Sequence, residues 1–394
     1  MSRKIEPLSG NYSVAYAARD VDVDVISAYP ITPQTTIVEK LADFIASGEL
    51  DAEYLHVESE HSALSAAIGA AAAGARVFTA TSSQGLVLMY ELLFVASGLR
   101  MPIVMALVAR ALSAPINIWN DHSDLMASND TGWIQIVTTN NQEAYDLTIL
   151  AYRLSERPDI SLPVMVVLDG YIQSHTVEPV QLEDRERVRS FVPKTKRAIT
   201  LDPEKPVTMG ALADPEWYYE FKVQQVEALE RVHNAFREVS GEFRNYFGRY
   251  YEPYQVYYES DSDTMLVVTG AHTGTFLKAV KAAREEGVKV GLVVLRLLRP
   301  FPHDLHKILS QHDFIGVADK SIYFGSPSSS YLANDIMTLL HLEGSNSRVV
   351  SYIYGIGGRV VRLEDALYVV KSLWRISKRL EEYPRKPIFV GVRY

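Results

Sequence analysis

The sequence has 394 residues, of which 47% are hydrophobic and 22% are charged, so it is long enough for two or three domains and has a globular composition. A formal net charge of -9 argues against a general nucleic-acid binder or a protein that docks on anionic lipid, and the charged start and short apolar runs predict a cytoplasmic protein. The absence of cysteine excludes a disulfide, a thiolate nucleophile or an iron–sulfur cluster held by this chain, so an electron carrier would have to come from a partner.

The first part of the chain, residues 21–168, alternates between short apolar strands and longer segments of helical period. Near-continuous apolar strands separated by helices indicate a parallel sheet that is covered on both faces. We therefore predict an α/β domain over residues 1–190, with strands at Val23–Tyr29, Tyr54–Val57, Val77–Thr81, Ile103–Val108 and Val164–Leu168.

The pattern breaks after this domain, where residues 191–260 contain charged segments and a tyrosine-rich passage that ends near Tyr258. The spacing predicts one amphipathic helix from Pro215 to about Val239, and we interpret the region as a connector packed on its neighbours. A second alternating stretch predicts another α/β domain over residues 261–394, with strands at Met265–Thr269, Val290–Leu295, Phe314–Ala318 and Val349–Ile353.

Unusual polar residues follow four strands of the first predicted domain. In open parallel sheets, ligands bind beyond the carboxyl ends of the strands, because the loops there face a common crevice. We therefore expect a functional site built from the loops Tyr29–Pro33, Glu58–His61, Ser82–Gly85 and Arg110–Pro115.

The first of these loops is expected to be stiff. Pro30 and Pro33 fix φ on either side of Thr32 and disfavour helical geometry in the residues before them, so the loop can hold Thr32 in one pose. The alternative is a strand-to-helix turn in which Thr32 or a neighbour caps a helix that begins near Thr35.

Glu60 and Arg110 each permit a functional and a structural interpretation. Glu60 precedes a run of small residues that lets a helix approach a neighbour or a cofactor closely, but an acidic residue behind an N-cap such as Ser59 suits any helix. Arg110 closes an apolar strand, so its guanidinium could bind a substrate carboxylate in a bidentate pair. The structural alternative is an intramolecular salt bridge with Asp121 or Asp124.

Two further stretches carry polar residues without a specific pattern. Asn120–Asp124 lacks a second histidine or a known ligand spacing, so we expect no metal site in this chain. Thr269–Gly274 follows a strand and opens a helix, but it matches neither the dinucleotide fingerprint nor the P-loop, and we interpret it as a tight turn.

Taken together, the four loops resemble those of the alpha subunits of the 2-oxoacid:ferredoxin oxidoreductase family, and within it the pyruvate:ferredoxin oxidoreductases. The stretches that carry the resemblance are Tyr29–Pro33, Val57–His61, Thr81–Gly85 and Arg110–Asn117, with Thr273–Thr275, Arg296–Pro302 and Gly355–Arg359 in the C-terminal part. The resemblance covers nearly the whole chain and is weakest in the connector. It implies a thiamine-diphosphate pyrimidine-binding-type parallel-sheet domain followed by a transketolase C-terminal-type α/β domain.

The resemblance also implies roles for individual residues. Glu60 would contact N1′ of the aminopyrimidine, where a carboxyl favours the tautomer that activates thiamine diphosphate. Thr32 and Arg110 would bind the carboxylate of the 2-oxoacid, and the loop with Tyr29 and Pro30 would lie against the cofactor. The implied reaction converts pyruvate and coenzyme A to acetyl-CoA, carbon dioxide and reduced ferredoxin.

Partner subunits are implied as well. The chain has no Gly-Asp-Gly element for magnesium and the diphosphate, which by the resemblance would come from a beta subunit. The 4Fe-4S clusters would lie in partners, among them gamma and ferredoxin-like subunits, and the hetero-oligomer would reduce ferredoxin. Family members often carry an acidic residue after Gly-Gly-Arg, whereas Val360 follows Arg359 here, which leaves the role of this loop open.

Three alternatives remain at this point. The substrate could be a branched-chain 2-oxoacid, 2-oxoglutarate or oxalate, although the stretch after Arg110 and the presence of Thr32 resemble the enzymes that act on pyruvate. The chain could instead be a non-catalytic assembly subunit, or a transketolase-like transferase without redox partners.

Overall fold

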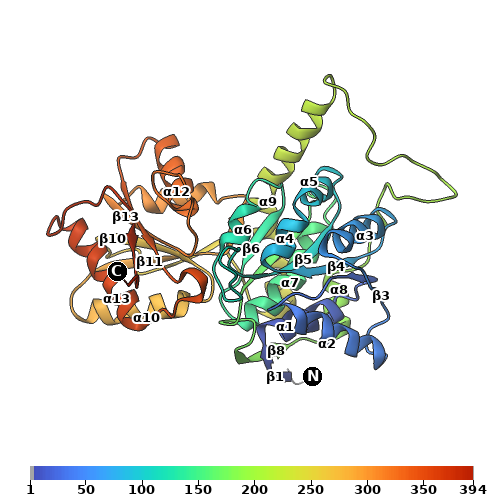
Figure 1. The fold of residues 1–394 in the computed structure, drawn as a ribbon, viewed down its shortest axis with the longest axis horizontal. Coiled ribbons are helices and arrows are strands. Elements are labelled where there is room, and N and C mark those ends of the chain that lie inside the picture. Colours follow the sequence, from blue (N-terminus) through green and yellow to red (C-terminus); the bar gives the residue numbers. More distant parts are fainter. Residues whose placement is uncertain (1–3, 394) are drawn as a thin grey trace.

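The computed structural model describes residues 4–393, which form two α/β domains joined by a long helix (Figure 1). The first sheet has the strand order β12-β6-β7-β5-β4-β2-β3, and all its neighbouring strands are parallel except β12 and β6. Its strands are Val25–Ser27 (β2), Glu53–Leu55 (β3), Val77–Thr81 (β4), Ile103–Ala109 (β5), Ile134–Val137 (β6), Val164–Asp169 (β7) and Leu297–Arg299 (β12).

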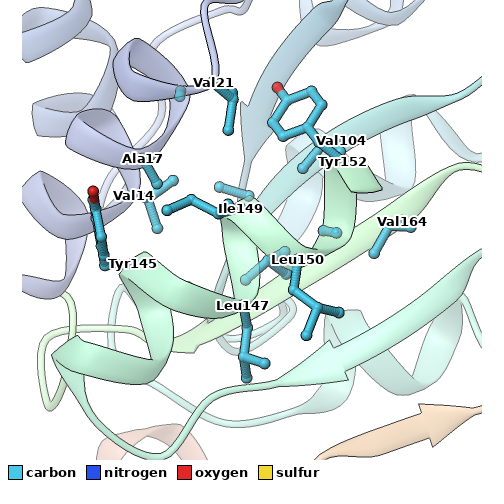
Figure 2. Close-up of a cluster of buried hydrophobic side chains, with 14 of the residues drawn as sticks. Val14, Ala17, Val21, Val104, Tyr145, Leu147, Ile149, Leu150, Tyr152 and Val164 are labelled. Atoms are coloured by element: carbon cyan, nitrogen blue, oxygen red, sulfur yellow. The ribbon is translucent and has the colours of Figure 1, made fainter. Parts of the chain in front are cut away.

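Helices cover both faces of this sheet. On one face, the apolar side chains of α7 meet those of β5 and β7, and α1 packs against α7 in the same buried core (Figure 2). α2 packs against α1 in this cluster. Each fully buried Leu, Ile or Val contributes about 1.5–3 kcal/mol, so this face is a main source of stability. The helices are Gly10–Asp20 (α1), Thr35–Ala46 (α2), Glu60–Ala72 (α3), Ser83–Leu88 (α4), Tyr90–Gly98 (α5), Ser123–Ala127 (α6), Asn141–Ser155 (α7) and Arg185–Phe191 (α8), and Lys4–Ser9 (β1) pairs antiparallel with Val177–Leu182 (β8).

The second sheet has the strand order β15-β14-β13-β10-β11-β9, in which only β9 is antiparallel to its neighbour. Its strands are Tyr254–Tyr257 (β9), Thr264–Thr269 (β10), Val290–Leu295 (β11), Phe314–Asp319 (β13), Arg348–Ile353 (β14) and Ile388–Phe389 (β15). The helices of this part are Thr273–Glu285 (α10), His306–Leu309 (α11), Tyr331–Leu342 (α12) and Leu363–Ser377 (α13), with 3-10 turns at His303–Leu305 (η1) and Ile356–Gly358 (η2).

The predicted fold class, two α/β domains with parallel sheets, is confirmed. The strands predicted from Val77 to Thr81 and from Val290 to Leu295 have the observed bounds, whereas the strand predicted over Val23–Tyr29 is shorter and spans Val25–Ser27. The division of the chain at residues 190 and 260 stays a prediction. Two strands do not follow its second boundary: β9 precedes residue 260 but joins the second sheet, and β12 follows it but joins the first sheet.

The connector helix is longer than predicted. It spans Tyr218–Phe247 (α9) and ends at Gly248, whose φ of 82° suits the left-handed residue that closes a helix. Its C-terminal half packs on the first domain through buried side chains such as Phe236 and Phe243, while its N-terminal half and the preceding loop extend away from the body (Figure 1). Exposed apolar side chains cluster there, among them Leu212, Trp217, Tyr219 and Phe221.

A single apolar cluster connects the two domains. It contains Leu107 and Val167 from the first sheet together with Val267 and Val293 from the second. The two domains therefore meet across a packed apolar interface. Within residues 4–393, no helix is long and apolar enough to cross a membrane.

Candidate active site

The four polar loops predicted from the sequence follow β2, β3, β4 and β5, which are consecutive in the sheet order β5-β4-β2-β3. Because these strands are parallel, their carboxyl ends lie at one edge of the sheet. The structure thus brings the candidate residues to the same edge.

Glu60 is the first residue of α3 and is 7% exposed. Ser59 caps the helix by accepting a hydrogen bond from the backbone N–H of Ser62 at 3.2 Å, so the predicted cap is present. The Glu60 carboxyl itself has no hydrogen-bond or ion-pair partner among residues 4–393. Helix capping therefore does not use this carboxyl, which stays free to bind a group outside the chain.

Gly85 in α4 lies directly against Glu60. A Cβ atom at this position would be 2.7 Å from Oε1 of Glu60 and 2.5 Å from Oγ1 of Thr81, far inside normal contact distance. The absence of a side chain therefore allows the backbone of α4 to pack directly against the carboxyl. The buried hydroxyls of Thr81 and Ser82 have no partner in residues 4–393, so this edge of the sheet retains unused hydrogen-bonding groups.

Arg110 follows β5 and is 7% exposed. Its Nε donates to the carbonyl oxygen of Asn117 and its Nη1 to that of Thr32, both at 2.8 Å. No carboxylate pairs with the guanidinium within the described residues, so the alternative of a salt bridge with Asp121 or Asp124 is wrong. Its Nη2 has no partner among residues 4–393, and a guanidinium with a free edge suits a planar anion.

The loop after β2 carries Thr32, Tyr29 and Pro30, all exposed. Two hydrogen bonds fix the backbone of this loop: Asn11 Nδ2 donates to the carbonyl of Pro33 at 2.7 Å, and Gln34 Nε2 donates to that of Tyr29 at 2.8 Å. The next helix does begin at Thr35, as the alternative interpretation expected, but its N-cap residue Gln34 makes no side-chain cap. The hydroxyl of Thr32 has no partner in residues 4–393 and remains available.

Asp124 connects the loop after β4 with the loop after β5. It is fully buried and accepts hydrogen bonds from the backbone N–H groups of Ser83 (2.8 Å), Arg110 (3.0 Å) and Leu125 (2.7 Å). Burial raises the pKa of this carboxyl to about 7, against the lowering effect of those N–H groups. The loops that carry Arg110 and Gly85 therefore share one anchor, which the sequence did not identify.

The polar side chains of Asn120–Asp124 form hydrogen bonds within the chain. Asp121 accepts from Ser123 at 2.6 Å, and His122 Nε2 lies 2.7 Å from Oδ1 of Asp169. Within residues 4–393, no group of three or more metal-ligating His, Asp or Glu side chains occurs. The Thr269–Gly274 segment forms a tight turn at Gly270 with φ 80°, and α10 begins at Thr273.

These side chains combine one unpaired carboxyl with one unpaired guanidinium at the same sheet edge. A nearly buried carboxyl can hydrogen-bond a protonated ring nitrogen, and a fixed guanidinium can hold a carboxylate. The chemistry of this edge fits the aminopyrimidine of thiamine diphosphate, since the nearly buried Glu60 carboxyl has no partner among residues 4–393 and the hydroxyls of Thr81 and Ser82 are buried without one. The fold and site define a class of two-domain α/β proteins with a partnerless carboxyl and a guanidinium at the carboxyl edge of the first parallel sheet.

Comparison with known proteins identifies the family. Residues 16–241 match the family model described as pyruvate flavodoxin/ferredoxin oxidoreductase, thiamine diP-bdg, and residues 262–366 match pyruvate:ferredoxin oxidoreductase core domain II. The chain therefore belongs to the pyruvate flavodoxin/ferredoxin oxidoreductase family. The resemblance seen in the sequence is confirmed, and so is the assignment of the first domain to a thiamine-diphosphate-binding type.

Curated relatives share most of their length with this chain. Pyruvate synthase subunit PorA of Methanocaldococcus jannaschii is 49% identical over 94% of this chain and 95% of its own length. The subunit of the same name from Thermotoga maritima is 47% identical, with 92% and 93% coverage. Ketoisovalerate oxidoreductase subunit VorA of Pyrococcus horikoshii is 42% identical over 96% of this chain and 98% of its own.

Solved structures share the fold at low identity. A 2-oxoglutarate:ferredoxin oxidoreductase from Magnetococcus marinus, solved with 2-oxoglutarate, coenzyme A and succinyl-CoA, matches with a TM-score of 0.74 and 19% identity. That match covers 94% of this chain, which spans 66% of the length of the other. A split-gene transketolase matches with a TM-score of 0.56 and 12% identity, covering 94% of this chain and 100% of its own.

Proposed function

We propose that this chain is the alpha subunit of a thiamine-diphosphate-dependent 2-oxoacid:ferredoxin oxidoreductase that converts pyruvate and coenzyme A to acetyl-CoA, carbon dioxide and reduced ferredoxin. The observation that carries the proposal is that Glu60 and Arg110, on loops at one sheet edge, are both nearly buried and have no ion-pair partner among residues 4–393. Burying a charge without a partner is costly, so such groups are typical of a site that awaits a ligand.

In this proposal, thiamine diphosphate supplies the nucleophilic carbon and the electron sink when it is bound. The Glu60 carboxyl holds the proton shared with N1′ of the aminopyrimidine, and Tyr29 and Pro30 form the wall beside the cofactor. Arg110 binds the substrate carboxylate through its guanidinium, and the Thr32 hydroxyl donates a further hydrogen bond. Fixing the carboxylate orients the carbonyl carbon of the 2-oxoacid for attack.

Pyruvate is favoured over other 2-oxoacids by the names of the relatives with 47–49% identity, which are pyruvate synthase subunits. A branched-chain substrate is the second candidate, since a ketoisovalerate oxidoreductase subunit is 42% identical. Assaying the native complex with pyruvate, 2-oxoisovalerate, 2-oxoglutarate and oxalate separates these possibilities by kcat/KM. A lower value for pyruvate than for any other acid would refute the assignment.

We further propose that a beta subunit supplies magnesium and the diphosphate grip, and that gamma and ferredoxin-like subunits with 4Fe-4S clusters pass electrons to ferredoxin. The absence of cysteine supports this division, because such clusters are held by thiolates. Exposed apolar side chains of α4 and α5 next to Gly85, including Val87, Leu88 and Val95, are suited to a partner that closes the site. Cytoplasmic location remains part of the proposal. Purifying the native complex and measuring its iron, thiamine diphosphate and subunits tests the division, and a complex without iron would refute it.

The role of Glu60 is tested by Glu60→Gln, which keeps the shape of the side chain and removes its charge. We expect the assembled complex to lose turnover while its subunits still associate. Glu58→Gln is the matched control, since Glu58 lies two residues away, is exposed and bonds only Ser62. Near-normal turnover of Glu60→Gln would refute cofactor activation and would favour a non-catalytic assembly subunit.

The role of Arg110 is tested by Arg110→Ala, for which we expect a large rise in the apparent KM for pyruvate. Losing a charge-assisted bidentate contact costs about 1.5–3 kcal/mol, or roughly 10-fold to 150-fold in affinity. Arg375→Ala is the control, because Arg375 pairs with Glu381 on the surface at 3.2 Å. An unchanged KM for Arg110→Ala would refute carboxylate binding.

A further inference from the structure

The loop between β5 and α6, residues 110–122, determines where the Arg110 guanidinium points. Arg110 begins this loop, and its Nε donates to the carbonyl oxygen of Asn117 seven residues later at 2.8 Å. The loop closes on itself, because the N–H of Ala111 donates to the carbonyl of Trp119 at 3.0 Å. A shift of Asn117 would therefore turn the guanidinium away from its position.

The second domain holds this loop through backbone contacts. Asn117 Nδ2 donates to the carbonyl of Gly357 at 3.0 Å, and the N–H of Gly357 donates to Oδ2 of Asp121 at 3.0 Å. The N–H of Gly358 donates to the carbonyl of Asn120 at 2.6 Å. The turn at Gly355–Gly358, which follows β14, thus contacts three residues of the loop.

Lys320 adds a buried anchor from the end of β13. Its side chain is fully buried, and its Nζ donates to Oδ1 of Asn120 and, at 3.1 Å, to Oδ2 of Asp169 at the end of β7. Asn120 in turn donates from Nδ2 to the carbonyl of Ala109, next to Arg110, at 2.9 Å. The carbonyl of Lys320 also accepts the N–H of His122 at 2.9 Å. One lysine of the second domain therefore connects the end of β5 with the end of β7.

The turn approaches the loop so closely that side chains would not fit. Gly357 and Gly358 have φ values of 59° and 77°, where glycine is favoured. A Cβ at Gly358 would be 2.3 Å from Cβ of Trp119, and one at Gly357 would be 2.7 Å from Nδ2 of Asn117. The glycines therefore serve this contact between the domains as well as the turn. Val360 is 73% exposed beyond the turn, so the missing acidic residue does not alter these bonds.

From these contacts we infer that the second domain is a positioning part of the substrate site. The Gly355–Gly358 turn and Lys320 hold residues 111–122 in the shape that aims Arg110 at the substrate carboxylate. This inference rests on the proposed function of Arg110. Gly357, Gly358 and Lys320 do not touch substrate in this scheme but act through Arg110.

Gly358→Ala in the assembled complex tests the inference. We expect the apparent KM for pyruvate to rise about 10-fold to 100-fold, since misplacing a binding group by about 1 Å has effects of this size. The KM for coenzyme A should change little, whereas the melting temperature of the complex should fall, because alanine is strained at a positive φ and overpacks against Trp119. Gly344→Ala is the matched control, because Gly344 has φ 70° in an exposed turn of the same domain and a Cβ there would meet nothing within 4 Å.

A double-mutant cycle separates positioning from general damage. If Gly358 acts through Arg110, then Gly358→Ala should cause no further rise in KM when Arg110 is already alanine. An equal rise in both backgrounds would overturn the inference, as would an unchanged KM in the single variant. If Arg110→Ala alone has no effect on KM, the proposed function of Arg110 fails instead, so the two failures are distinguishable.

Asn117→Ala provides a second variant without backbone strain, in case Gly358→Ala does not fold. It removes the hydrogen bond from Nδ2 to Gly357 and the one that Oδ1 accepts from the N–H of Trp119 at 2.7 Å. We expect the KM for pyruvate to rise in the same direction, again only when Arg110 is present. An unchanged KM for Asn117→Ala would overturn the inference.

Discussion

Replacing Gly85 with alanine probes the site without touching a charged group. The new Cβ would lie 2.7 Å from Oε1 and 2.8 Å from Cγ of Glu60, whereas ordinary contacts begin at 3.4 Å. Glu60 would have to retreat by the difference between 3.4 Å and 2.7 Å, about 0.7 Å. It cannot swing away freely, because it begins α3 and is almost fully buried.

A displacement of this size should reduce kcat/KM for pyruvate by about 10-fold to 100-fold, which corresponds to about 1.4–2.7 kcal/mol of transition-state stabilisation. Overpacking should also reduce the free energy of unfolding by about 1–3 kcal/mol. The assay is the coenzyme-A-dependent reduction of ferredoxin by the purified complex. Titration with thiamine diphosphate should show weaker binding of the cofactor, because the carboxyl that contacts it has moved.

Gly69→Ala is the matched control for this experiment. Gly69 lies in α3, the helix that Glu60 begins, and an added Cβ would meet no atom within 4 Å. Alanine on the exposed face of a helix should leave activity unchanged and increase the free energy of unfolding by up to about 1 kcal/mol. If Gly85→Ala is as active as Gly69→Ala, the close packing of α4 against Glu60 does not serve the cofactor and the reasoning is refuted.

Three further changes act on buried ionisable groups. Burial, with Lys320 nearby, lowers the pKa of His272 to about 3. Between about pH 6.5 and pH 3, the imidazole is therefore protonated in the unfolded chain but not in the folded protein, so the free energy of unfolding decreases as the pH falls. His272→Gln should therefore reduce the stability lost between pH 7 and pH 5 by about 2 kcal/mol, measured by denaturant titration at both pH values. Asp124 gives the opposite pH dependence, because burial raises its pKa to about 7. Its contribution to stability is complete below pH 3.8 and is lost as the pH rises through 7. Asp124→Asn should flatten the loss of stability between pH 5 and pH 8, and an unchanged slope would contradict the buried titration. Lys320→Met leaves Asp169 without its buried cation and should reduce the free energy of unfolding by about 3–5 kcal/mol, seen as a lower melting temperature. Combining it with Asp169→Asn should remove this loss.

The strands at the centre of both sheets could be predicted from sequence, because they are buried on both faces and read as continuous apolar runs. β4, β5, β7 and β11 are of this kind. The loops after them were then placed at one edge by the parallel topology alone. The same topology places Glu60, Thr32 and Arg110 after neighbouring strands, so their proximity follows from the sequence pattern.

The contacts between distant segments could not be predicted. β6 was missed because four residues interrupted by Gln135 are too short for a clear pattern, and β12 because its strand partner lies about 160 residues earlier in the chain. The sequence suggested Asp124 as a partner for the Arg110 guanidinium or as part of a metal-ligand stretch, whereas its carboxyl accepts from the backbone N–H of Arg110. Such backbone acceptors leave no signal in the spacing of side chains.

The strand β12 also affects how the chain is made. It pairs with β6 at the edge of the first sheet, and Arg296 beside it binds the buried carboxylate of Glu143 in α7 at 2.8 Å. While the ribosome is still synthesising the second domain, β6 therefore has an open hydrogen-bonding edge and Glu143 lacks its cation. An unpaired edge strand is prone to join other chains, so the N-terminal domain released by itself should aggregate. The first sheet is thus completed only when residue 299 has emerged from the ribosome.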